Sequence, residues 1–183
     1  DQLAPPLHPR EVDIVEGALS MKTKLAMDIY TPLNNVYAVA DDMVLNKRAI
    51  TIIYSHGYSR VPVYRRNPDD EDDISAITGY LVVRQLMLVD WDDNRVLSTL
   101  PVKRPTCVSP RMDLVRLMRL LQSEGPTMTF LCARPDLANR ALRNGDKIPV
   151  EAGLIGLITI VDIIESILQD RIYDEEDILD RNK

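Results

Sequence analysis

The chain has 183 residues, which is the length of one ordinary domain or of two small units packed together. Its composition, with 45% hydrophobic and 27% charged residues, indicates a globular protein rather than a disordered one. The formal net charge of −6 argues against nucleic acid as the main partner, because a phosphate backbone favours cationic surfaces.

The negative charge is concentrated in two short runs, NPDDEDD at 67–73 and YDEEDILD at 173–180. Neither run has the glycine turn and the ligand spacing of a calcium loop, so we interpret both as solvated segments. Cys107 and Cys132 lack metal-ligand spacing, and we expect both thiols to be reduced and partly buried. No apolar run reaches the length of a membrane span.

Two parts of the chain repeat the same order of predicted elements. The first comprises YTPLNNVYAVADDMVL, NKRAITIIYSHGYSRVPVY and ITGYLVVRQLMLVD, and the second comprises LPVKRPTCVSPRMDL, VRLMRLLQSEGPTMTFLCA and AGLIGLITIVDIIESIL. Each reads as a short strand, an amphipathic helix, two hydrophobic strands separated by a loop, and a closing helix. The repeat predicts these equivalent pairs: Pro32 with Pro101, Val39 with Val108, Leu45 with Leu114, and Gly79 with Gly156.

The element types follow from hydrophobic spacing. Leu114, Leu117, Met118 and Leu121 lie at i, i+3, i+4 and i+7, which predicts one apolar face of a helix. The runs GYLVV and GLITI are continuously apolar, as expected for strands that are covered on both faces. A β-α-β-β-α unit of this size is marginally stable alone, so we expect the two units to bury their sheets against each other.

The repeated pattern resembles a pair of cystathionine-β-synthase (CBS) domains, also called a Bateman module. The stretches ALSMKTKLAMDIYTPLNNVYAV, GYSRVPVY, LVDWDDNRVLSTL and GLITIVDIIESIL, followed by DRIYDEEDI, resemble the CBS pair of the cyclin M (CNNM/CorC) divalent-metal transport mediators. The resemblance implies an α/β (α+β) fold of two tandem CBS repeats with pseudo-two-fold symmetry, preceded by an N-terminal helix. The division implied is a linker and helix at 1–24, repeats at 25–92 and 93–170, and an acidic tail at 171–183.

The resemblance also implies a function. It indicates a regulatory module that binds an adenine nucleotide, ATP with Mg²⁺, and couples binding to the conformation of a homodimer formed through the CBS helices. The module is expected to be the cytosolic part of an integral membrane protein, covalently linked to an upstream transmembrane domain. The alternative is a CBS pair that dimerises structurally and binds no nucleotide.

Thr159 and Asp162 lie three residues apart, where GLIT ends as a strand and a helix begins. Unpaired backbone N–H groups at such a helix start favour anionic ligands, and a carboxylate there can accept hydrogen bonds from ribose hydroxyls. The same spacing is close to a capping box, which needs no ligand. In CBS domains the equivalent Thr and Asp lie on the phosphate and ribose side of a bound nucleotide, and the resemblance implies the same role for Thr159 and Asp162. The first repeat has Val82 and Gln85 at these two positions.

The resemblance combines Thr159 and Asp162 with polar segments of the first repeat, from which further nucleotide-binding residues are expected: Thr31, Tyr58, Ser59, Arg60, Val61 and Pro62. Arg60 would bind phosphate oxygens through its fork of donors, unless it pairs with the acidic loop 67–73. Tyr58 would lie against the adenine or simply fill the core. Val61 and Pro62 would form an apolar wall. The mirror site would carry Leu100 in place of Thr31.

The sequence does not support an enzyme. It contains no GxxxxGK[ST] phosphate loop, and its two histidines, His8 and His56, lie in no nucleophile pattern. We expect His56 to cap the helix that precedes it, near the negative end of the helix dipole.

Overall fold

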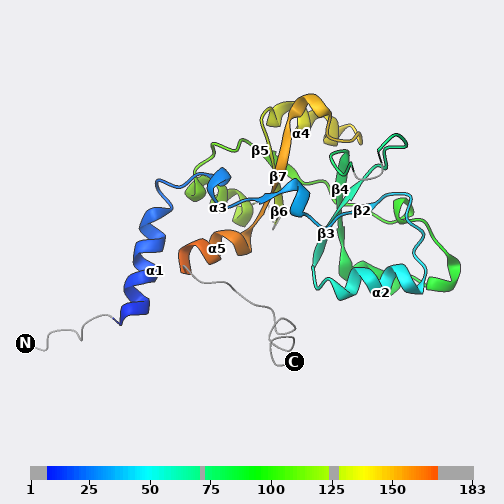
Figure 1. The fold of residues 1–183 in the computed structure, drawn as a ribbon, viewed down its shortest axis with the longest axis horizontal. Coiled ribbons are helices and arrows are strands. Elements are labelled where there is room, and N and C mark those ends of the chain that lie inside the picture. Colours follow the sequence, from blue (N-terminus) through cyan, green and yellow to red (C-terminus); the bar gives the residue numbers. More distant parts are fainter. Residues whose placement is uncertain (1–7, 71–72, 124–127, 169–183) are drawn as a thin grey trace, which may run out of the picture.

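The computed structural model describes residues 8–70, 73–123 and 128–168. Two β-sheets form its centre, one with strand order β1-β7-β6-β5 and one with order β2-β3-β4 (Figure 1). The strands are β1 (Thr31–Pro32), β2 (Val39–Ala40), β3 (Arg60–Tyr64), β4 (Ile77–Val82), β5 (Thr106–Val108), β6 (Met128–Cys132) and β7 (Leu154–Thr159). The α-helices are α1 (Pro9–Ser20), α2 (Lys47–Ser55), α3 (Leu114–Ser123), α4 (Pro135–Arg143) and α5 (Ile160–Leu168). The predicted acidic tail, 171–183, lies outside the described residues.

The two sheets share a central core. Tyr64, Ile77 and Tyr80 of one sheet belong to the same buried cluster as Phe130 and Leu157 of the other. Burial of this apolar surface is the main favourable contribution to holding the two units together. The predicted mutual burial of the two sheets is therefore confirmed, and so is the mixed α/β fold class.

Each sheet has a second core on its other face. Val61, Val63 and Leu81 pack with residues of α2. Ile158 and Leu131 pack with α3 and α5, which lie together on one side of the four-stranded sheet (Figure 1). Successive residues of a strand point to opposite faces, so β4 and β7 contribute to both cores. The expectation that GYLVV and GLITI are covered on both faces is confirmed.

Strand pairing confirms most of the predicted equivalences. Val39 pairs with Val63, which pairs with Gly79, and a bulge follows Val63. Equivalently, Val108 pairs with Leu131, which pairs with Gly156, and a bulge follows Leu131. Leu45 and Leu114 are equivalent too, because their N–H groups donate to the carbonyls of Arg95 and Lys24, respectively.

The predicted match of Pro32 with Pro101 is wrong. Thr31 pairs with Leu157 on β7, and the equivalent of Leu157 is Tyr80, which pairs with Lys103. Lys103, not Leu100, therefore occupies the position of Thr31 in the mirror half. The first half has three more residues between Thr31 and Val39 than the second half has between Lys103 and Val108, and the 3₁₀ helix Leu33–Asn35 lies in the longer stretch. An ungapped alignment anchored on the prolines cannot detect such an insertion.

The helices depart from the predicted order at two places. The closing segment of the first half is a 3₁₀ helix, Val83–Leu88, without a side-chain cap, whereas α5 starts with the capping pair Thr159–Asp162. The loop between the last two strands of the second half contains α4, which the repeat analysis missed. Pro135 at its first turn and Gly145 beyond its end, with φ of +83°, are ordinary helix start and stop signals.

The expected N-terminal helix is α1, and it packs against α5 at the far side of the four-stranded sheet (Figure 1). Gly17 is buried there, and a Cβ on Gly17 would overlap the backbone carbonyl of Ile167. The glycine is thus required for the close approach of the two helices. Cys107 and Cys132 are both buried and free of any disulfide.

Candidate functional site

The start of α5 is organised by Thr159 and Asp162. Asp162 Oδ2 accepts hydrogen bonds from the Thr159 N–H, at 2.6 Å, and from Thr159 Oγ1, at 2.7 Å. Thr159 Oγ1 in turn accepts a bond from the Asp162 N–H at 3.3 Å. This is the capping arrangement that the spacing allowed. Both hydrogen bonds from Thr159 are accepted by Oδ2, so Oδ1 takes part in neither of them.

The carboxyl of Asp162 is partly buried, and this desolvation raises its pKa above the usual value for an aspartate. The hydrogen bonds from Thr159 act in the opposite direction because they favour the charged form, while the nearby carboxylate of Glu165 raises the pKa further. Two acidic groups therefore share one face of α5, and the ionised form of Asp162 favours hydrogen-bond donors or a cation at Oδ1.

Thr31 lies next to this helix start. It pairs with Leu157, two residues before Thr159 on β7. The crossing is close, because a Cβ on Gly156 would overlap the carbonyl oxygen of Thr31. The structure therefore brings together three of the predicted site residues, one from the first half of the chain and two from the second.

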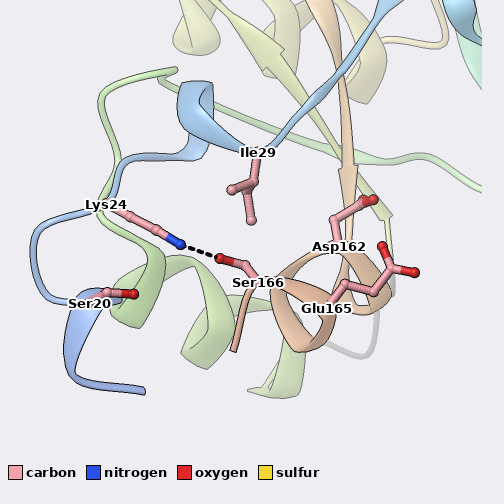
Figure 2. A pocket seen from close by; sticks show the side chains of 6 residues that line it. All are labelled: Ser20, Lys24, Ile29, Asp162, Glu165 and Ser166. Carbon is pink, nitrogen blue, oxygen red and sulfur yellow. Dashed lines mark hydrogen bonds between the residues drawn. The ribbon is translucent and has the colours of Figure 1, made fainter. Parts of the chain in front are cut away.

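Asp162 also lines an open pocket of about 510 Å³, together with Ser20, Lys24, Ile29, Glu165 and Ser166. Figure 2 shows Lys24 reaching from the turn after α1 towards α5, where its Nζ donates to Ser166 Oγ at 3.0 Å. The sequence analysis did not select the other five residues as site residues. Lys24 lies in the MKTK segment, which supported the family resemblance, but no local pattern showed that the segment folds back onto α5.

The residues predicted from GYSRVPVY lie on the other sheet. Arg60 pairs with Val82 at the start of β3, and the Ser59 carbonyl accepts a hydrogen bond from the Val83 N–H at 3.0 Å. Arg60 is partly buried and forms no ion pair among the described residues, whereas Arg65 and Arg66 pair with Asp41 and Asp42.

Val61 is fully buried in the core formed with α2, and Pro62 is buried opposite Tyr80. Arg60, Val61 and Pro62 belong to β3 of the three-stranded sheet, whereas Thr159 ends β7 of the four-stranded sheet. The structure therefore places the two predicted groups on separate sheets.

Three aromatic rings stack beside the start of β3. The rings of Tyr37 and His56 lie 3.7 Å apart between centroids, and the Tyr58 ring is 6.2 Å from each of them. His56 is the C-cap residue of α2, as expected. Tyr58 is 52% exposed, so it does not fill the core. Burial raises the pKa of the Tyr37 hydroxyl.

The pseudo-symmetric counterpart of this site has different chemistry at the equivalent positions. Val82 and Gln85 replace Thr159 and Asp162, and Lys103 replaces Thr31. The Oε1 atom of Gln85 is buried and accepts no hydrogen bond from the described residues. The lack of a hydroxyl at Val82 explains why this helix start has no capping pair. The two ends of the pseudo-symmetric pair are therefore not chemically equivalent.

Comparison with known proteins gives related sequences and related folds. No protein-family model matches the chain. It is 31% identical over 178 residues to metal transporter cnnm-1 of Caenorhabditis elegans, covering 94% of this chain and 20% of the relative. It is 27% identical over 168 residues to protein MAM3 of Saccharomyces cerevisiae, covering 92% of this chain and 21% of the relative. The CBS domain of the bacterial CNNM/CorC family Mg²⁺ transporter has the same fold, with a TM-score of 0.70 and 23% identity. The match covers 92% of this chain and 88% of the bacterial domain.

The chain is a CBS-domain pair of the CNNM/CorC family. A structure of the bacterial CBS domain in complex with ATP also matches this chain, with a TM-score of 0.67 and 22% identity. The match covers 88% of this chain and 99% of the bacterial domain. The CBS pair spans about a fifth of the length of the curated relatives it matches. None of the helices in the described ranges is long and apolar enough to cross a membrane. In the same ranges, no three His, Cys, Asp or Glu side chains cluster as metal ligands would.

Proposed function

We propose that this CBS pair is a regulatory module of a CNNM/CorC-type divalent cation transport protein and that it binds ATP together with Mg²⁺. The observation that carries the proposal is the start of α5, where Asp162 offers one carboxylate oxygen beside Thr159 and the crossing strand of Thr31. The complex of the bacterial relative with ATP supports a nucleotide as the ligand.

Each residue has a specific role in this proposal. Asp162 Oδ1 accepts hydrogen bonds from the ribose hydroxyls, and the positive end of the α5 helix dipole favours the phosphates. Thr31 adds a hydroxyl from the crossing strand. Arg60 and Ser59 reach the phosphates from β3, Tyr58 covers the adenine, and the backbone of Val61 and Pro62 forms the adjoining wall. These β3 contacts require the ligand to bridge the two sheets.

Mg²⁺ fits this proposal for electrostatic reasons. ATP brings about four negative charges, and Mg²⁺ is coordinated mostly by phosphate oxygens and water in such complexes. The chain has a net charge of −6, so metal-free ATP is repelled at long range. The protein is therefore expected to bind the magnesium complex more tightly than free ATP.

A ligand that touches both sheets favours one relative placement of the two repeats over another. We infer that the division at 25–92 and 93–170 marks these two repeats, and that their movement changes the geometry of a homodimer. In this proposal α1 relays the change to a covalently linked transmembrane domain, and the module lies on the cytosolic side of the membrane. The bound nucleotide acts as a signal, and the module is not an enzyme.

One observation favours a second candidate, a structural dimerisation module that binds no nucleotide. Asp162 and Thr159 satisfy each other as a helix cap, which is sufficient reason for both residues without any ligand. The two candidates differ in what happens when Asp162 is replaced.

Calorimetric titration with ATP, in magnesium and in chelator, distinguishes the two. We expect binding in magnesium, weaker binding in chelator, and loss of binding in Asp162→Ala with the fold retained. Asp113→Ala is the matched control, since Asp113 caps α3 through the Arg116 N–H at 2.8 Å but lies outside the pocket. No heat and no thermal shift with ATP, ADP or AMP would establish the structural candidate, and equal affinity in chelator would exclude the role of Mg²⁺.

A further inference from the structure

Two helices meet next to the candidate site. α1 packs against α5, and at Gly17 the two backbones approach so closely that a Cβ would overlap the carbonyl oxygen of Ile167. The candidate site lies at the start of α5, whereas Ile167 lies near the end of the same helix. A single helix of nine residues therefore carries both the proposed ligand-binding aspartate and the surface on which α1 docks.

Lys24 joins these two regions. It belongs to the turn that follows α1, and its Nζ donates to Ser166 Oγ on α5 at 3.0 Å (Figure 2). Backbone bonds hold the turn on both sides. The Lys24 N–H donates to the Ser20 carbonyl at 3.1 Å, and the Lys24 carbonyl accepts from the Leu114 N–H of α3 at 3.2 Å. Because the backbone of Lys24 is bonded to the last residue of α1, the ammonium group leaves its place on α5 when α1 does.

The charge of Lys24 is important because the pocket between the two helices is otherwise acidic. Among the described residues that line this pocket, Lys24 is the only cation, and Asp162 and Glu165 are carboxylates. Thr159 and Ser166 are seven residues apart, so the ammonium lies about 10 Å along the axis from the start of α5, which is comparable to the Debye length of about 8–10 Å. Lys24 therefore attracts an anionic ligand at the helix start, while the two carboxylates repel it. The site is more favourable for a nucleotide when α1 is docked than when it is displaced.

We propose that Lys24 couples nucleotide binding at the start of α5 to the docking of α1. The inference rests on the proposed nucleotide-binding function and specifies how α1 responds to the ligand. The two states are α1 docked on α5, with Lys24 at Ser166, and α1 displaced from α5. The docked state binds ATP more tightly because it brings the charge of Lys24 to the pocket. Bound ATP therefore favours docking, and linkage requires that the two effects are equal in size.

Calorimetry with ATP in magnesium and amide hydrogen exchange in residues 9–20 test this coupling. We expect saturating ATP to slow exchange in α1 of the unmutated protein about five- to tenfold, the lower part of the usual range for coupled sites. Lys24→Met is expected to weaken ATP binding by a similar factor and to remove the effect of ATP on exchange. Lys24→Arg keeps the charge and is expected to retain both properties. Lys22→Met removes an exposed lysine of the same turn outside the pocket, and it is expected to behave as the unmutated protein.

A second pair of variants displaces α1 without changing the residues of the pocket. We expect Gly17→Val to weaken ATP binding by the factor by which ATP slows exchange in α1, and Ala18→Val, at an exposed neighbouring position, to leave ATP binding unchanged. Exchange in α1 that does not respond to ATP, or an unchanged ATP affinity in Gly17→Val, would overturn the inference while the proposed function stands. Weaker ATP binding in Lys24→Met with the effect of ATP on exchange retained would also overturn it, because Lys24 would then be a ligand contact alone. If the unmutated protein binds no adenine nucleotide, the proposed function fails together with the inference.

Discussion

Gly156 on β7 lies against the backbone of Thr31, so closely that a Cβ on Gly156 would overlap the Thr31 carbonyl oxygen. The contact joins the first half of the chain to the sheet of the second half, and it is the crossing on which the candidate site is built. Gly79 makes the equivalent crossing with Val102 and Lys103 in the mirror half. Both glycines are therefore required by the tertiary fold rather than by a turn.

The Gly156→Ala substitution is expected to destabilise the protein by about 1–3 kcal/mol, the usual range for overpacking, because backbone atoms cannot move aside as a flexible side chain can. Gly79→Ala is expected to have a similar effect. The free energy of unfolding, measured with urea, checks both. Unchanged stability in Gly156→Ala would show that the two segments lie further apart than the structure indicates.

The Thr159→Val substitution gives α5 the residue that the mirror half has at Val82. It removes the hydroxyl that donates to Asp162 and accepts from its N–H. We expect a loss of about 1 kcal/mol in the free energy of unfolding, typical of a lost helix cap, together with weaker ATP binding. Thr159→Ser keeps the hydroxyl and is expected to preserve both properties. Equal effects of Val and Ser would rule out the hydrogen bonds as the cause.

The raised pKa of Asp162 makes a specific prediction about stability and pH. Because burial raises this pKa in the folded state, folded protein holds the proton more tightly than the unfolded chain does. The contribution of Asp162 to stability therefore becomes less favourable as the pH rises from the usual aspartate pKa through the raised folded-state value. In Asp162→Asn this titration is absent.

Urea unfolding of the unmutated protein and of Asp162→Asn, from about pH 4 to about pH 7, measures this effect. The stability of the variant relative to the unmutated protein is expected to increase with pH across the window. A relative stability that decreases with pH would mean that the hydrogen bonds from Thr159 outweigh burial and that the folded-state pKa is lowered instead.

Gly17 allows α1 to pack on α5, where any side chain would meet the backbone of Ile167. We expect Gly17→Val to displace α1 and to speed amide hydrogen exchange in residues 9–20. Ala18→Val is the control, because it places a valine at an exposed neighbouring position, where the substitution lowers helix propensity, which Gly17→Val does not. Similar exchange in the two variants would show that the close contact does not hold α1 in place.

Much of the site could be predicted from sequence because it depends on local spacing. Thr159 and Asp162 are three residues apart at a junction of strand and helix. That spacing alone predicted two roles for the pair, ligand binding and capping of the helix. Lys24 could not be found in this way. It is 142 residues from Ser166 in the chain, and nothing in its local pattern indicates where the turn after α1 lies relative to α5.

The sequence by itself determined the two repeated units, the apolar faces of their helices and strands, and the capping pair, since each is encoded by neighbouring residues. The tertiary structure alone decided the pairing of Lys103 with Tyr80, the 3₁₀ form of the closing helix in the first half, and the pocket between α1 and α5. These features depend on contacts between distant segments, where a three-residue difference in loop length shifts the register and hydrophobic periodicity gives no signal.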